Sequence, residues 1–217
     1  MTYMVSPRWH VSEDTMLYAR VASGYRPGGP NVFLPGVPPQ VDADKLTNYE
    51  IGLKTRFLEN RALINAAVFY IDWTNIQQAV GFGGVSGLDN AGDATSRGVE
   101  FESLFSVTER LRLGLNAAYT DATLESSPPA LNNREGARLP SAPEWTGSVT
   151  ADYSFPLGDW AGRVGGGLRF IDEQETQVVT LTDNLSWVQP SYEVLDLNAV
   201  GDFDLYVDGA DEADPKL

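Results

Sequence analysis

The sequence of 217 residues has no cysteine, a single histidine and no long apolar run. Without cysteine, the chain forms no disulfide and offers no thiolate nucleophile or thiolate zinc ligand. No window approaches the roughly 18 to 20 apolar residues that a membrane helix needs, and residues 1–11 lack a basic region followed by an apolar stretch. We therefore expect neither a helical span nor a signal peptide. His10 alternates with Trp9 and Val11, which is typical of a strand residue rather than a catalytic base.

Positive charge is also scarce, with 15 basic against 30 acidic residues and a formal net charge of −15. A surface that neutralises phosphates needs an excess of Lys and Arg, so we predict no nucleic-acid partner. The segment 81–87 is rich in glycine but has no Gly-Lys-Ser/Thr of a phosphate loop. The acidic residues after position 201 do not follow the order of an EF-hand.

Glu100 and Glu102 could be drawn as a carboxylate pair, but glycosidase carboxylates normally lie on separate strands that flank a cleft. We expect them instead to face the same side of one strand and to bond to neighbouring arginines. The sequence therefore predicts no enzymatic activity, no catalytic residue, no metal site and no cofactor.

What the sequence does contain is apolar and polar residues that alternate with a period of two. In residues 49–57 the odd positions are mostly apolar, whereas Glu50, Lys54 and Arg56 occupy even positions. The same division recurs in four more segments and, more weakly, in four others: 99–102, 111–117, 145–153 and 163–170, then 8–11, 16–25, 62–73 and 192–199. The pattern predicts an all-β chain of about nine antiparallel strands without helices.

The connections between these strands alternate between short and long. Short turns are predicted at Glu13-Asp14, Glu59-Asn60, Glu109-Arg110 and 156–159, about 46 to 50 residues apart. Long segments rich in Gly, Pro, Asn and Asp lie between them, at 27–44, 78–92, 125–143 and 172–189. In an up-and-down sheet all short turns then fall at one end and all long loops at the other, which is typical of outer-membrane barrels.

Alternation alone does not decide whether the apolar face meets a protein core or lipid. Tyr49 and Phe57 lie eight residues apart on one face, and Trp145 and Tyr153 repeat this spacing. Eight residues of strand span about 26 Å, which approximates the apolar band between two aromatic girdles. This favours a transmembrane β-barrel segment of about nine strands, part of a larger barrel. The alternatives are a soluble β-sandwich, a propeller with a repeat near 48 residues, and a small self-closed passive pore.

The barrel interpretation assigns each face. Candidates to face lipid are Tyr49, Ile51, Leu53, Phe57, Leu113, Leu115, Trp145, Val149 and Tyr153. Candidates to face the lumen are Glu50, Lys54, Arg56, Glu100, Glu102, Arg112, Arg163 and Arg169.

Five segments resemble strand and loop motifs of the TonB-dependent receptor family, and they follow one another in the family's order. Residues 18–29 resemble the strand that leads to a "GfrpGg" loop, and residues 46–54 resemble the "E-x-G-x-K" strand. Residues 67–77 are similar to "FY-x-D-y-x-d-I-Q", and residues 90–102 to "NaG-x-a-x-x-x-GvE-x-E". Residues 138–143, Arg-Leu-Pro-Ser-Ala-Pro, resemble the entry into the next strand.

The resemblance implies a function in the outer membrane of a Gram-negative bacterium. It covers nearly the whole chain, with residues 1–200 corresponding to the C-terminal part of the barrel and 201–217 forming an atypical or truncated acidic end. Family members close a barrel of about 22 strands around an N-terminal plug and import iron-siderophore or similar ligands with the help of TonB. Neither the plug nor the segment that contacts TonB is recognisable here. The expected partners are therefore outer-membrane lipid, a small ligand such as an iron chelate and, in the intact receptor, TonB.

Overall fold

The computed structural model describes residues 1–82, 85–127, 135–158, 160–176 and 187–202. All regular secondary structure in these residues is β-strand, as predicted. In the described part of the chain, no helix is long and apolar enough to cross a membrane.

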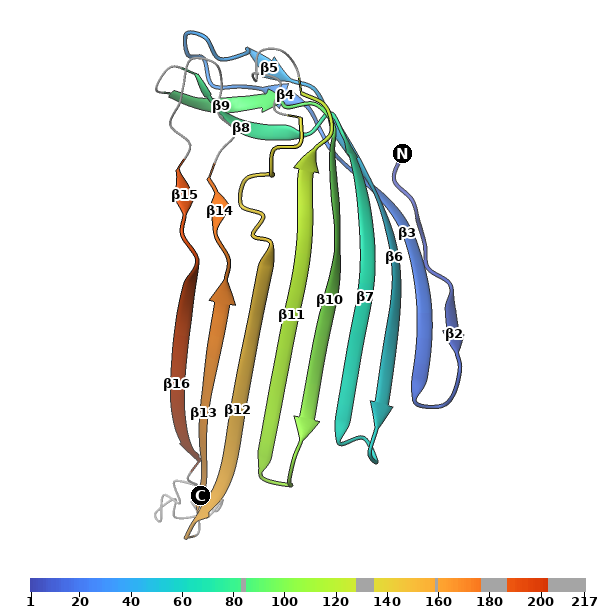
Figure 1. The fold of residues 1–217 in the computed structure, drawn as a ribbon, viewed down its shortest axis with the longest axis vertical. Helices are drawn as coiled ribbons and strands as arrows, with labels where there is room; N and C mark the ends of the chain where they lie inside the picture. Colours follow the sequence, from blue (N-terminus) through green and yellow to red (C-terminus); the bar gives the residue numbers. More distant parts are fainter. Residues whose placement is uncertain (83–84, 128–134, 159, 177–186, 203–217) are drawn as a thin grey trace, which may run out of the picture.

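Eight long strands form the body of one antiparallel sheet (Figure 1). They are β3 (Thr15–Arg26), β6 (Asp44–Phe57), β7 (Ala62–Thr74), β10 (Ala94–Ser106), β11 (Leu111–Leu124), β12 (Trp145–Leu157), β13 (Trp160–Ile171) and β16 (Tyr192–Asp202). Their order in the sheet is their order in the chain. This confirms the predicted up-and-down antiparallel arrangement.

The ninth strand is an edge strand in two pieces, β1 (Met4–Val5) and β2 (Arg8–His10), and both pieces pair with β3. Pro7 lies in the interruption and has no backbone N–H to donate, which is why proline is tolerated at a sheet edge. Its carbonyl still accepts a hydrogen bond from the Ala19 N–H at 3.1 Å. The two pieces together with the eight long strands agree with the predicted count of about nine.

The short turns lie at one end of the sheet and the long connections at the other (Figure 1). The turn between β6 and β7 contains three successive residues with positive φ angles, Leu58, Glu59 and Asn60, at 53°, 57° and 66°. The turn between β12 and β13 uses Gly158 with φ 67°, and Asp159 lies outside the described residues. We call the two ends the turn end and the loop end.

Small hairpins rise from the loop end, where the sequence predicts only loops. They pair β4 (Gly29–Pro30) with β5 (Gln40–Val41), β8 (Gln77–Phe82) with β9 (Val85–Asn90), and β14 (Gln174–Glu175) with β15 (Val188–Gln189). Apart from Gln77, the β8–β9 hairpin lies within the segment 78–92, whose glycines obscure the alternation that would reveal a strand. Residues 128–134 and 177–186 of the other predicted loops lie outside the described residues.

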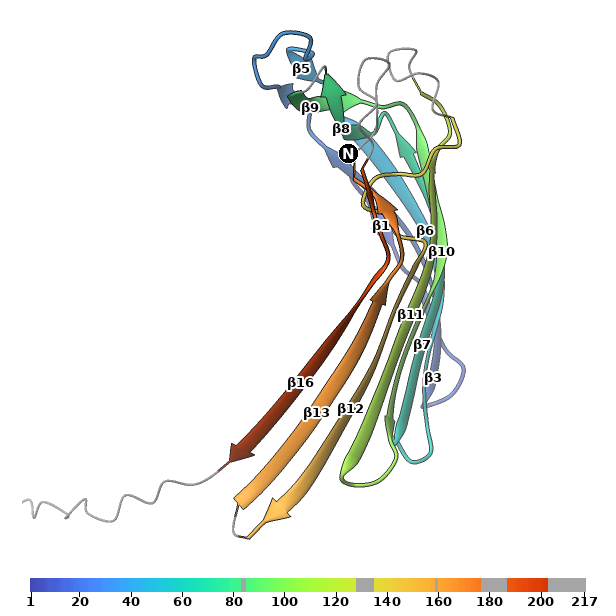
Figure 2. The same ribbon diagram turned by 60° about the vertical axis from the view of Figure 1, so that its left-hand side comes forward.

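The long strands form a single curved layer (Figure 2). In the described residues the other sheets are the three two-stranded hairpins at the loop end, so no second sheet covers either face. A sandwich needs two stacked sheets and a propeller needs several separate ones, and this excludes both alternatives. The sheet is also not closed, because β16 at one edge and β1 and β2 at the other do not pair with each other.

The buried core lies at the loop end, away from the middle of the long strands. Ile76 and Val80 are fully buried, and Leu124 is 1% exposed. Ala91, Ala94, Ala122 and Leu139 complete this cluster, and Trp73 and Phe82 pack against it. In the described residues the buried cluster therefore lies where the hairpins and loops join the sheet, while Ala62, 4% exposed, is buried at the turn end.

Two leucines on β11 test this distribution of the core. Leu124 is 1% exposed, whereas Leu115, nine residues earlier, is 42% exposed. With the chain refolded in detergent micelles, we expect Leu124→Ala to lower the free energy of unfolding by about 2–5 kcal/mol, because it leaves a cavity. Leu115→Ala leaves none and should cost clearly less. Urea titration followed by circular dichroism measures both, and equal losses would contradict the assignment of the core.

Candidate functional site

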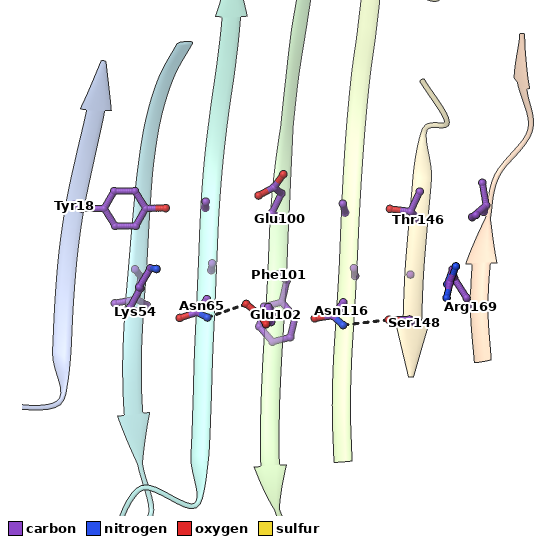
Figure 3. A pocket seen from close by; sticks show the side chains of 17 residues that line it. Tyr18, Lys54, Asn65, Glu100, Phe101, Glu102, Asn116, Thr146, Ser148 and Arg169 are labelled. Atoms are coloured by element: carbon purple, nitrogen blue, oxygen red, sulfur yellow. Dashed lines mark hydrogen bonds between the residues drawn. The ribbon is translucent and has the colours of Figure 1, made fainter. Parts of the chain in front are cut away.

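The middle of the sheet has one face rich in polar side chains and one face rich in apolar ones, because side chains alternate along each strand. We call the face that carries Tyr18, Lys54, Glu102 and Arg169 the polar face. It is hollowed by an open cavity of about 620 Å³, which is lined by residues from β3 to β13 (Figure 3). The opposite face, which carries Ile51, Leu115 and Val149, is called the apolar face.

A row of polar residues crosses six neighbouring strands on the polar face. The strand register places them side by side in the order Lys54, Asn65, Glu102, Asn116, Ser148, Arg169. Asn65 Nδ2 donates to Glu102 Oε2 at 2.9 Å, and Asn116 Nδ2 donates to Ser148 Oγ at 3.1 Å (Figure 3). The row begins and ends with a cation and has a carboxylate between them.

The pairing of the glutamates differs from the prediction. Glu102 accepts its hydrogen bond from the Asn65 amide and not from an arginine. In the described part of the chain, neither Glu100 nor Glu102 takes part in an ion pair. The predicted arginine partners were inferred from composition, whereas the register sets amides and alanines beside these two glutamates.

The "E-x-G-x-K" motif of β6 is organised around Tyr18 of β3. The Tyr18 hydroxyl donates to Glu50 Oε1 at 2.7 Å, and Arg20 forms an ion pair with the same carboxylate. A Cβ on Gly52 would lie 2.3 to 2.5 Å from atoms of the tyrosine ring, so only glycine leaves room for it. Lys54 Nζ lies 6.0 Å from the ring centroid. Glu50, Gly52 and Lys54, the named positions of the motif, therefore all contact one side chain on the neighbouring strand.

A second aromatic ring lies over a glycine on the same face. Phe69 of β7 is directly opposite Gly98 of β10, and a Cβ on Gly98 would lie 2.8 Å from Cζ of the ring. Gly98 is the glycine of the "GvE-x-E" motif. Covering a strand glycine with a cross-strand aromatic ring restores the packing that glycine lacks.

All eight predicted lumen-facing residues lie on the polar face by their positions in the strands. They are Glu50, Lys54, Arg56, Glu100, Glu102, Arg112, Arg163 and Arg169. Arg56 extends toward the turn end, where its guanidinium lies 3.7 Å from Asp14. Arg169 lies 3.8 Å from Asp196 of β16. Sequence reasoning missed Tyr18, Arg20 and Asn65, since β3 and β7 have weak alternation.

All nine predicted lipid-facing residues lie on the apolar face. Ile51 is 66% exposed, Val149 53% and Trp145 51%, and Leu53 is half-buried. The other five are exposed as well: Tyr49, Phe57, Leu113, Leu115 and Tyr153. Large apolar side chains that the sequence analysis did not single out enlarge this face: Val68, Val99, Leu168, Leu195 and Leu197.

Aromatic pairs lie toward both ends of the apolar face. Toward the loop end, the ring centroids of Tyr49 and Tyr70 are 6.5 Å apart, and those of Tyr119 and Trp145 are 4.9 Å apart. Toward the turn end, the rings of Tyr153 and Phe155 stack with centroids 6.2 Å apart. Aliphatic residues occupy the strands between these aromatic groups.

At the loop end a buried carboxylate ties three connections together. Asp44, 1% exposed, accepts from Arg26 Nε at 3.1 Å and from the Gln77 N–H at 3.1 Å. Arg26 Nη2 also donates to the Gln77 carbonyl at 2.8 Å. Asp44 lies beyond Tyr49, outside the apolar band. Burial alone would raise the pKa of its carboxyl, but the hydrogen bonds from Arg26 and Gln77 outweigh burial and hold this pKa below its ordinary value.

Asparagines extend this network to the next loops. Asn90 Oδ1 accepts from the Asp42 N–H at 2.8 Å, and Asn90 Nδ2 donates to the Asp42 and Asn75 carbonyls at 3.0 Å each. Asp93 Oδ1 accepts from the Asn75 N–H at 2.9 Å. Arg26, Gln77 and Asn90 belong to three of the motifs quoted from the sequence, so these motifs converge on one network.

The described residues contain no group of three or more His, Asp or Glu placed to hold a metal ion. The acidic residues 203–217 lie outside the described part of the chain. What the described arrangement offers is an open cavity on the polar face, an exposed apolar surface on the other face and loops anchored at one end.

The contact between Tyr18 and Gly52 can be tested by a double-mutant cycle. Gly52→Ala should displace the ring and break its hydrogen bond to Glu50, at a cost of about 1–3 kcal/mol in unfolding free energy. In a Tyr18→Ala background the same substitution should cost almost nothing. Gly24→Ala is the matched control, because its Cβ would have only ordinary contacts, at 3.7 Å and beyond. Urea titration in micelles gives the four values, and equal costs in both backgrounds would refute the contact.

Known proteins resemble this chain in sequence. It matches the family model described as TonB dependent receptor-like, beta-barrel, over residues 2–210. The pesticin receptor of Yersinia enterocolitica is 35% identical over 102 residues, which cover 46% of this chain and 15% of the receptor. A TonB-dependent receptor of Haemophilus influenzae is 27% identical over 177 residues, covering 79% of this chain and 48% of that protein. The chain thus spans less than half the length of these relatives.

Solved structures share the fold. The ferric yersiniabactin uptake receptor FyuA from Yersinia pestis aligns with a TM-score of 0.70 at 21% identity, covering 90% of this chain and 29% of that one. The siderophore receptor PiuA from Acinetobacter baumannii aligns with a TM-score of 0.68 at 20% identity, covering 91% and 29%. The single curved sheet is therefore a part of such a barrel. Together with the family match over residues 2–210, this shows that the chain belongs to the TonB-dependent receptor family and forms part of its β-barrel.

Proposed function

We propose that this chain is the C-terminal part of the wall of an outer-membrane receptor that imports iron chelates or related metal chelates. The polar face lines the lumen, and the apolar face meets the hydrocarbon of the outer membrane of a Gram-negative bacterium. The observation that carries this proposal is the apolar face itself, which is exposed along the middle of the sheet and has aromatic pairs toward both ends. The chain has no catalytic role in this proposal.

The dimensions of the apolar face support its placement in a bilayer. Tyr49 and Phe57 lie on one strand, eight residues apart. At about 3.3 Å per residue this separation is about 26 Å, close to the ~25 Å height of the outward apolar band of outer-membrane barrels. Exposure of such a large contiguous apolar surface to water would carry a high free-energy cost.

The edges of the sheet support a larger barrel. The outer edges of β16 and of the β1–β2 strand have no strand partner in the described chain. Within a membrane an unpaired backbone N–H or C=O costs several kcal/mol, so the missing strands must close the barrel. The solved receptors are long enough to contain such further strands, since this chain covers only 29% of the length of two of them.

The ligand class is proposed from the relatives and from the loop end. The related proteins include a ferric yersiniabactin uptake receptor and, at 25% identity over 88% of this chain, a metal-pseudopaline receptor of Pseudomonas aeruginosa. In this chain the loop end exposes Phe33 and Trp187, which are 98% and 68% accessible. We propose that the loops capture a chelate and that TonB, acting on the complete receptor, drives its entry.

Adjacent residues on β12 test the orientation of the sheet. Val149 lies on the apolar face and Ser148 on the polar face. We expect Val149→Arg to destabilise insertion by about 2–4 kcal/mol, because arginine would face hydrocarbon. Ser148→Arg adds the same charge to an aqueous lumen and should insert like the unmodified chain. Flotation with phospholipid vesicles after a urea wash measures insertion, and equal behaviour of the two variants would contradict the proposed faces.

An uptake experiment tests the transport function. The complete reading frame that contains this chain should be expressed in a Gram-negative strain that lacks its own ferric-chelate receptors. We expect growth under iron limitation with at least one of a panel of ferric siderophores, and loss of that growth when TonB is deleted. A receptor that is detected at the cell surface but takes up no metal chelate would refute the proposed ligand class.

A further inference from the structure

Three arginines gather at the turn end of the sheet. Arg110 lies in the turn between β10 and β11, Arg112 near the start of β11, and Arg163 near the start of β13. They line one cavity of about 270 Å³ together with the hydroxyl side chains of Ser106, Thr108 and Ser154. We call these three residues the turn-end arginine cluster.

The register of the sheet brings the cluster together. Ser154 of β12 is paired with Arg163, and its backbone N–H donates to the Arg110 carbonyl at 2.8 Å. Arg112 lies on β11 with Ser106 on one side and Asp152 on the other. The three cations therefore come from the β10–β11 turn, from β11 and from β13, with Ser154 of β12 between them, and they meet at one corner of the polar face.

The three cluster arginines form no ion pair in the described residues, a property that they share there with Arg8 and Arg61. Six arginines form ion pairs within the described residues: Arg20, Arg26, Arg56, Arg97, Arg138 and Arg169. None of the three cluster arginines has a carboxylate within ion-pair distance in the same part of the chain. Three like charges that share a cavity repel one another, so an anion placed between them would stabilise the arrangement.

Two carboxylates, Asp152 and Glu109, also line the cavity, but neither pairs with the cluster. Asp152 is opposite Arg112 in the register, yet its side chain leans the other way, over Gly165 of β13. Its Oδ1 lies 2.5 Å from the point where a Cβ of residue 165 would stand, and the Asn198 amide lies 3.1 Å from that point. The absence of a side chain at Gly165 thus lets Asp152 turn away from the guanidinium of Arg112.

We infer that the turn-end arginine cluster is a binding site for an oxyanion, the phosphate or carboxylate group of a small solute or of a lipid headgroup. Guanidinium groups bind such groups with paired charge-assisted hydrogen bonds, and the serine and threonine hydroxyls supply further donors. The site itself does not depend on the proposed transport function. That function only adds its location, at the periplasmic mouth of the lumen, where short turns lie.

The charge at the other end of the sheet strengthens this placement. The four long connections, 27–44, 78–92, 125–143 and 172–189, contain nine Asp or Glu residues and two Arg residues. An anion on the polar side of the sheet is therefore repelled at the loop end and attracted at the turn end. The arginine cluster places three cations together at the turn end of this face.

The test titrates the full chain in zwitterionic detergent micelles with two probes, inorganic phosphate and dihexanoyl phosphatidylglycerol, and follows binding by ³¹P NMR. The double variant Arg112→Gln/Arg163→Gln should weaken binding by about tenfold per arginine, since each loses a charge-assisted hydrogen bond. The matched control, Arg56→Gln/Arg97→Gln, removes the same charge away from the cavity and should change affinity by less than about twofold. Circular dichroism verifies that every variant keeps its β-structure.

A second variant should bind the anion more tightly, a result that misfolding would not produce. Asp152→Asn removes a negative charge from the cavity and should tighten binding several-fold. Saturable binding of inorganic phosphate would identify a free oxyanion as the ligand, and binding of the lipid alone would identify a headgroup. Equal weakening in both double variants, or no saturable binding of either probe, would overturn the site. Neither result depends on whether the complete receptor transports a chelate.

Discussion

In a single layer of strands, the backbone hydrogen bonds form between neighbouring strands within the sheet, and both faces of the sheet are left uncovered. In a soluble sheet protein one face would be buried against a second layer. Here the core residues Ile76, Val80 and Leu124 lie at the loop end, and the middle of the long strands has no protein on its apolar side in the described residues. The surroundings, and not a protein core, must therefore stabilise the apolar face.

The side chains of the two faces need different partners, although they belong to the same strands. On the apolar face, which we propose meets hydrocarbon, the side chains need no specific polar partner, so aliphatic residues suffice between the aromatic ends. On the polar face the side chains must satisfy one another, and they do so through specific neighbours such as Asn65 with Glu102 and Tyr18 with Glu50. Glycines take part because Gly52 and Gly98 let large rings lie flat across a neighbouring strand.

At the loop end, a hydrogen-bonded network forms the base of the loops. Asp44, Arg26 and Gln77 come from three successive long strands or their extensions and are joined by hydrogen bonds around a buried carboxylate. Asn90 joins the β8–β9 hairpin to the same base. This network fixes where the loops leave the sheet, as expected of a scaffold for the ligand-binding loops that we propose.

Much of this arrangement was predictable from the sequence, because a period of two fixes which residues share a face. Segments 49–57 and 145–153 show it clearly, and the turn positions gave the polarity of the sheet. Contacts between strands were not predictable, because the motif includes a glycine at position 52 but does not indicate that the Tyr18 ring of the neighbouring strand covers it. The β8–β9 hairpin was missed because glycines interrupt its apolar pattern. The loop-end network needs the register of three strands, which alternation alone does not supply.

If hydrocarbon touches the apolar face, as we propose, neighbouring residues on one strand should meet lipid and water in turn, and adjacent cysteines can report this difference. The chain has no cysteine, so Leu115→Cys and Asn116→Cys can each carry one fluorescent label without background. In phospholipid vesicles, we expect nitroxide lipids to quench the label at position 115 and aqueous iodide to quench the label at position 116. Equal quenching at both positions, or the reverse pattern, would contradict this proposal.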